Sequence, residues 1–189
     1  SLRLAGDGQI PPPADLPPCR AFVQNPPVRL STLVAPPLMH GTGWFTAMIA
    51  WLTGGSVLML DEPRRFDAAD LWGVVTRERA SSIAMVGDSF AKPMIRELER
   101  AGAQYDLTSL LMIASAGVMW SEESKQALLA ANPELVLIDS FSSSEAIGMG
   151  PSVTTAAGSV QTARFQLGPE TQLFDEALRP LAKTPGVKG

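Results

Sequence analysis

The sequence has little of several residue types on which particular folds and sites depend. Among its 189 residues there is one cysteine, Cys19, and one histidine, His40. A single cysteine excludes an intrachain disulfide and a zinc site built from several cysteines, and it predicts a cytoplasmic location, where thiols stay reduced. Charged residues make up 18% of the chain and the formal net charge is −4. The sequence therefore offers no basic surface for nucleic acid.

Long hydrophobic runs and several catalytic motifs are also missing. The longest apolar run lies around Trp44–Leu52, well short of the ~20 apolar residues that cross a bilayer, so we expect no integral membrane segment. The first residues lack the organisation of a signal peptide. No G-x-S-x-G, H-E-x-x-H or C-x-x-C motif occurs, and no G-x-x-x-x-G-K-[ST] phosphate loop. Hydrolase, metalloprotease and P-loop chemistry thus have no supporting motif.

Proline dominates the start of the chain. Within the first 29 residues lie Pro11-Pro12-Pro13, Pro17-Pro18 and Pro26-Pro27. Proline removes backbone donors and favours extended geometry. We interpret residues 1–29 as a loop or arm that belongs to a larger protein.

From Leu30 onward, short apolar runs alternate with helical patterns. A helix is predicted where Ala68, Leu71, Trp72 and Val75 share one face, with Asp67 as its N-cap. The other predicted helices run from after Gly43 to Gly54-Gly55, from about Phe90 to Gly102, and from Ser121 to Asn132-Pro133. The predicted strands are Leu30–Ala35, Ser56–Leu60, Ser82–Val86, Leu110–Ser115 and Leu135–Asp139.

Strands separated by helices predict an α/β fold with a mainly parallel sheet and helices on both faces. The strand runs are apolar throughout rather than alternating, which is typical of strands covered on both faces. We expect this subdomain to span residues 30–150. Shorter extended pieces follow, around Val160–Gln166 and Thr171–Asp175, and predict a short mixed β element within residues 151–189.

The loops that follow the strands are the candidate site, because ligands bind beyond the carboxyl ends of the strands in an open parallel sheet. His40 lies in the first such loop, before Gly41 and Gly43, where glycine lets the backbone approach a ligand. A single histidine is either a structural hydrogen-bonding residue or a catalytic one. The residues alone leave both interpretations open.

A polar loop, Ser140–Glu145, follows the last predicted buried strand. Glu145 could hold a divalent cation through its oxygens, and the hydroxyls of Ser142, Ser143 and Ser144 could donate to phosphate oxygens. The alternative is a polar loop that leads into a helix, with one serine as the N-cap.

At these loops the sequence resembles the adenylate-forming superfamily, which includes acyl-CoA synthetases, luciferases and nonribosomal peptide adenylation domains. The family's P-L-[FM]-H-x-x-G segment is matched by Pro37-Leu38-Met39-His40-Gly41-Thr42-Gly43. Its S-G-G-A-P segment is matched by Ser115-Ala116-Gly117-Val118-Met119, and its N-x-Y-G-x-T-E segment by Asp139–Glu145. The runs Trp51–Gly55 and Ser142–Gly150 are most similar to fatty-acyl or steroid-side-chain CoA ligases of actinobacteria.

The resemblance implies an AMP-forming acyl-CoA ligase that uses ATP/AMP, Mg²⁺ and coenzyme A and activates a hydrophobic carboxylic acid through an acyl-adenylate. Phe141 would stack on adenine, Asp139 would lie at the exocyclic amine, and Glu145 would ligate Mg²⁺. The implied catalytic residues are His40, Ser144 and Glu145. The implied nucleotide-binding residues are Ala116, Gly117, Val118, Asp139, Ser140, Phe141 and Ser144. The implied acyl-site residues are His40, Gly41, Thr42 and Val86.

The chain departs from the family pattern at four motif positions. Phe141 replaces a tyrosine and loses a hydroxyl, Asp139 replaces an asparagine, and glycines are replaced at Ala116 and Ser142. The family's phosphate loop, its T-G-D ribose motif and its C-terminal domain with the catalytic lysine are not in the sequence. We therefore expect an internal fragment that is inactive alone and that forms a homodimer through exposed subdomain surface.

Two other interpretations stay open. The chain is either a non-catalytic nucleotide- or partner-binding module of the same fold, or part of an adenylation domain for amino or aryl acids. The second alternative needs an aspartate in the specificity pocket, and Asp88 is the candidate.

Overall fold

The computed structural model describes residues 20, 23–26, 28–143, 149–158, 164–166 and 171–181. Its helices are α2 (Gly41–Leu52), α3 (Ala68–Glu78), α4 (Gly87–Ala101) and α5 (Glu122–Ala131), with a 3₁₀ turn at Gly102–Gln104. Its strands are β1 (Ser31–Val34), β2 (Ser56–Leu58), β3 (Ser82–Met85), β4 (Met112–Ala116), β5 (Val136–Phe141), β6 (Gly150–Thr154), β7 (Leu173–Phe174) and β8 (Pro180–Leu181).

Six strands form one sheet in the order β2-β1-β3-β4-β5-β6. The first five are parallel, and β6 pairs antiparallel with β5. The strands β7 and β8 form a separate antiparallel pair. The predicted α/β class, the mainly parallel sheet and the short additional β element are thus confirmed.

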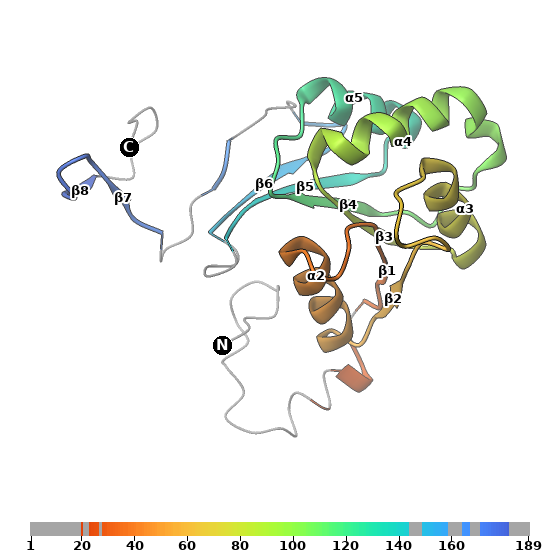
Figure 1. The fold of residues 1–189 in the computed structure, drawn as a ribbon, viewed down its shortest axis with the longest axis horizontal. Coiled ribbons are helices and arrows are strands. Elements are labelled where there is room, and N and C mark those ends of the chain that lie inside the picture. Colours follow the sequence, from red (N-terminus) through yellow and green to blue (C-terminus); the bar gives the residue numbers. More distant parts are fainter. Residues whose placement is uncertain are drawn as a thin grey trace.

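Helices cover the sheet from both sides. In Figure 1, α2 lies on one face of the sheet, and α3, α4 and α5 lie side by side on the other. The chain leaves β1 through α2 toward β2 but leaves β3 through α4 toward β4, so the two connections run in opposite directions. The carboxyl ends of β1 and β3 therefore flank a topological switch point, where open α/β sheets bind ligands.

The core lies between the sheet and the three helices α3, α4 and α5. Leu33, Ile83, Ile113 and Leu137 are register partners across four neighbouring strands, and each is fully buried. The indole N–H of Trp72 on α3 donates to the carbonyl of Met94 on α4 at 3.0 Å, which satisfies the one polar group of that buried side chain.

Local signals placed most elements within one or two residues. Asp67 caps α3 by accepting from the amides of Ala69 and Asp70, and Ser121 caps α5 by accepting from the amide of Ser124. The predicted start of α2 after Gly43 is wrong, because His40 caps the helix and α2 begins at Gly41.

The predicted covering of the strands on both faces does not hold equally for every strand. It holds for β3, where every residue is buried, but in β4 and β5 buried residues alternate with partly exposed ones. The reason is that α2 packs mainly over β1, β2 and β3. Ala114, Ile138 and Val153 are register partners on the face that α2 leaves open. Within the described residues, no helix combines the length and apolarity needed to cross a membrane.

Candidate functional site

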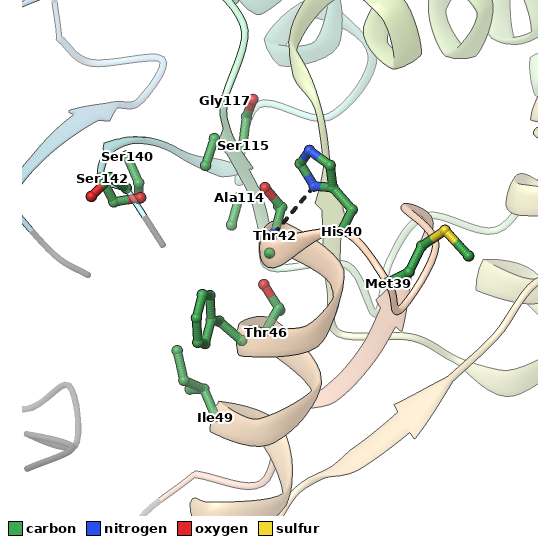
Figure 2. Close-up of a pocket in the computed structure, with 14 residues that line it drawn as sticks. Met39, His40, Thr42, Thr46, Ile49, Ala114, Ser115, Gly117, Ser140 and Ser142 are labelled. Carbon is green, nitrogen blue, oxygen red and sulfur yellow. Dashed lines mark hydrogen bonds between the residues drawn. The ribbon is translucent and has the colours of Figure 1, made fainter. Parts of the chain in front are cut away.

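A pocket of about 400 Å³ opens at the switch point, between the start of α2 and the ends of β4 and β5 (Figure 2). Its walls come from the loop after β1, the exposed side of α2, the end of β4 and the end of β5. The lining residues are Met39, His40, Gly41, Thr42, Phe45, Thr46, Ile49, Ala114, Ser115, Ala116, Gly117, Ser140, Ser142 and Ser143. Residues from all three sequence segments that carried the family resemblance thus meet at one cavity.

His40 and the first turn of α2 form one wall. The Nδ1 of His40 accepts a hydrogen bond from the amide of Thr42 at 3.3 Å. A neutral imidazole that accepts at Nδ1 carries its proton at Nε2, so His40 offers an N–H donor on its other side. Gly41 and Thr42 belong to the helix N-terminus, where backbone N–H groups and the helix dipole favour an anion. This wall suits a carboxylate or a phosphate.

The loop after β4 forms a second wall, which contacts the first. Gly117 has φ of +90°, and a Cβ there would lie 3.8 Å from Cε1 of His40 and 4.0 Å from Oγ1 of Thr42. The loop is fixed from behind by Gly87, whose φ is +49° and whose Cβ would lie 2.6 Å from the carbonyl oxygens of Val118 and Met119. Only glycine leaves room for that approach, so these backbones pack directly on each other.

The third wall is the end of β5. Ser140 and Ser142 line the pocket, whereas Asp139 points to the opposite face of the sheet. There the Nζ of Lys125 lies 3.4 Å from Oδ2 of Asp139, and both side chains are buried. Burial raises the pKa of Asp139 above its usual value, although Lys125 and a hydrogen bond from the Ser140 amide act in the other direction.

Six of the predicted site residues line the pocket: His40, Gly41, Thr42, Ala116, Gly117 and Ser140. Val86 lies beside Gly117, with its Cγ1 3.9 Å from the Cβ position of that glycine. Val118 is half exposed. Phe141 is also half exposed, and its ring lies 5.6 Å from that of Phe165. Two predicted catalytic residues, Ser144 and Glu145, lie outside the described residues.

Sequence reasoning did not single out the residues that line the lower part of the pocket. Phe45, Thr46 and Ile49 of α2 line it together with Ala114 of β4. Thr42, Thr46 and Ile49 stand at i, i+4 and i+7, the spacing of one helix face, so the periodicity of α2 contained this signal. A second, smaller pocket of about 60 Å³ continues beneath α2, and Thr46, Ile49 and Ala114 line both.

Asp88, the candidate specificity residue for an amino acid substrate, does not line the pocket. Its Oδ1 accepts from the amide and the hydroxyl of Ser121, both at 3.1 Å, and its Oδ2 lies 3.2 Å from Nζ of Lys92. Burial on its own would raise the pKa of Asp88, but these donors together hold it below the usual value. Asp88 therefore joins the start of α4 to the start of α5.

Nothing in the described part of the chain groups three or more histidine, cysteine, aspartate or glutamate side chains that could hold a metal ion. The donors that line the pocket are instead hydroxyls, one imidazole and backbone amides. Such a set fits the phosphate and sugar oxygens of a nucleotide, and the glycine backbone at Gly117 gives a flat ring close access.

Curated relatives of this chain are acyl-CoA ligases by name. It is 31% identical over 157 residues to the medium-chain acyl-CoA ligase Mig of Mycobacterium avium. The aligned region covers 83% of this chain and 28% of that relative. It is 29% identical over 170 residues to a medium/long-chain-fatty-acid–CoA/3-oxocholest-4-en-26-oate–CoA ligase of Mycolicibacterium smegmatis. That aligned region covers 87% of this chain and 30% of the relative. The chain thus spans less than a third of the length of either relative.

Solved structures share the fold at low sequence identity. CmiS6 superposes with a TM-score of 0.71 and 15% identity over 89% of this chain and 41% of its own. The family model described as AMP-binding enzyme matches residues 18–189. On this match over nearly its whole length, the chain belongs to the AMP-binding enzyme family.

Proposed function

We propose that the protein containing this chain is an AMP-forming acyl-CoA ligase for a hydrophobic carboxylic acid. In the first step, a carboxylate oxygen bonds to the α-phosphorus of ATP and the bond to pyrophosphate breaks. In the second, the thiolate of coenzyme A bonds to the acyl carbon and the bond to AMP breaks. Family membership and the names of the relatives support this reaction class.

One observation carries the proposal: a smaller, mostly apolar pocket lies beneath α2, beside the polar rim of the larger one. The rim holds His40, Thr42 and Ser140, which suit the carboxylate and the phosphates. Ile49 and Ala114 line both pockets, and we infer that the two form one passage for the acyl chain. A substrate with an apolar chain and one anionic end fits such an arrangement, because it buries its chain while its charged end meets donors.

The substrate class follows from the same passage. We infer a fatty acid of medium or greater length, or a sterol side-chain acid, as the names of the relatives suggest. An amino acid fits less well, because Asp88 is occupied by Ser121 and Lys92 and does not line the pocket.

The roles of individual residues are part of the proposal. The Nε2–H of His40 donates to the acid or the adenylate, Ser140 and Ser142 donate to phosphate oxygens, and Phe141 stacks on adenine. Ser144 would contact the α-phosphate, and Glu145 would hold Mg²⁺, which would neutralise phosphate charge. The cytoplasmic location and the homodimer stay predictions.

The test is thioester formation by the complete protein with ATP, Mg²⁺, coenzyme A and a series of fatty and sterol side-chain acids. We expect pyrophosphate release that depends on the acid, and a strong loss in Glu145→Ala. Glu123→Ala, an exposed carboxylate on α5, is the matched control and should keep full activity. If the protein neither releases pyrophosphate nor binds AMP, the ligase proposal fails and a partner-binding module of the same fold becomes the better account.

A further inference from the structure

A lysine lies fully buried behind the pocket. Lys125 extends from α5 toward the sheet and is 0% exposed. Its Nζ lies 3.4 Å from Oδ2 of Asp139 and 5.4 Å from the ring centroid of Trp120. Lysine is almost never fully buried without a partner. A buried ammonium at this place therefore needs a reason beyond packing.

Both partners of Lys125 are covalently joined to pocket walls. Asp139 directly precedes Ser140, whose side chain lines the pocket from the opposite face of the strand. Trp120 ends the loop that starts with the pocket-lining residues Ala116 and Gly117. The end of β4 and the end of β5 are also register neighbours, through Ala116 and Ser140. One ammonium thus holds the rear of two pocket walls.

Stability alone does not account for the pair. Replacing a buried ion pair by apolar residues of similar volume often leaves stability unchanged or higher, whereas removing one partner strands the other charge. The burial that raises the pKa of Asp139 reflects this cost of desolvation. A charged pair, however, accepts fewer geometries than an apolar contact, because its hydrogen bond depends on distance and direction.

We propose that Lys125 and Asp139 form a positioning pair, which holds the end of β5 and the loop after β4 in the geometry of the pocket without touching the ligand. The identity of the ligand as a nucleotide rests on the proposed function. The mechanical role of the pair does not.

The experiment compares the complete wild-type protein with K125M/D139L, which removes both charges. Hydrogen exchange without ligand should rise roughly tenfold at the amide of Gly117 and stay unchanged in α3. The dissociation constant for AMP, measured by calorimetry, should rise about tenfold. If K125M/D139L does not fold, K125Q/D139N removes the same charges and keeps both polar ends.

Leu128→Ala is the matched control. Leu128 lies one turn after Lys125 on the same buried side of α5, and it does not line the pocket. This variant should lower the melting temperature but leave exchange at Gly117 and the affinity for AMP near wild type. Exchange in K125M/D139L that rises no more than in Leu128→Ala overturns the proposal. If the wild type does not bind AMP, the proposed function fails, while the exchange comparison still decides the role of the pair.

Discussion

His40 and Gly117 lie side by side at the rim of the pocket, although 77 positions separate them in the chain. A Cβ on Gly117 would lie 3.8 Å from Cε1 of His40, and Figure 2 shows the two residues near each other at the start of α2. The contact joins the loop after β1 to the loop after β4, with β3 between these strands in the sheet. An acid held by His40 would therefore lie beside the glycine wall that we assign to the nucleotide.

Substitution of His40 separates its role as the N-cap of α2 from its proposed role as a hydrogen-bond donor to the substrate. His40→Ala removes the N-cap of α2 and should cost about 1 kcal/mol in the free energy of unfolding. His40→Asn keeps a capping oxygen and should retain most of that stability. Both lose the Nε2–H donor, which is worth about 1.5–3 kcal/mol toward a charged group, or roughly ten- to hundredfold in kcat/KM. Urea unfolding and pyrophosphate release measure the two effects. Full activity in His40→Asn would show that His40 does not act in the reaction.

Gly87→Ala should be strongly destabilising. Its φ of +49° and the two carbonyl oxygens 2.6 Å from the Cβ position leave no room for a methyl group, so we expect a loss of about 1–3 kcal/mol or more. Gly73→Ala in α3 is the matched control, because a Cβ there meets nothing within 4 Å. That variant should gain roughly 0.5–1 kcal/mol from helix propensity. Equal effects of the two substitutions, measured by urea unfolding, would contradict the close packing at Gly87.

The pair formed by Lys125 and Asp139 should behave as a unit in stability measurements. Asp139→Leu leaves a buried ammonium without a counter-charge and should cost about 3–5 kcal/mol. K125M/D139L should cost much less than Asp139→Leu, because no charge remains buried. A double-mutant cycle by urea unfolding tests this coupling. Additive losses would show that the two residues contribute independently.

Ala114→Leu should shorten the accepted substrates. The larger side chain fills the passage beneath α2 where the two pockets meet, so KM for a long fatty acid should rise about tenfold or more while that for a short acid changes little. Ala69→Leu on α3, on the other side of the sheet, is the control for a leucine substitution. A uniform change for all chain lengths would place the acyl chain elsewhere.

Asp88 should make the free energy of unfolding depend on pH in the acid range. Its pKa is lower in the folded protein than in the unfolded chain, so its contribution is fully present above about pH 4 and is lost as pH falls through the lowered folded value. Asp88→Asn lacks this contribution. The difference in unfolding free energy between wild type and Asp88→Asn should therefore shrink as pH falls below about 4, as urea titrations at several pH values can measure. A difference that stays constant would contradict the shift.

The sequence by itself determined the elements and the loops that carry chemistry, because those signals are local. Side-chain caps such as Asp67 and Ser121 and the 3.6-residue spacing in α3 depend on neighbours within one or two turns. The rule that ligands bind beyond the carboxyl ends of parallel strands then pointed to His40, Gly117 and Ser140.

Only the tertiary structure decided which side chains face the pocket. Strand alternation allows Asp139 to point to either face until the packing of α5 is known, and the structure turns it toward Lys125. Ala114 joins the pocket because α2 covers only part of the sheet, and that coverage follows from the strand order. Sheet order and facing depend on contacts between residues far apart in the chain, and a single sequence carries no local mark of them.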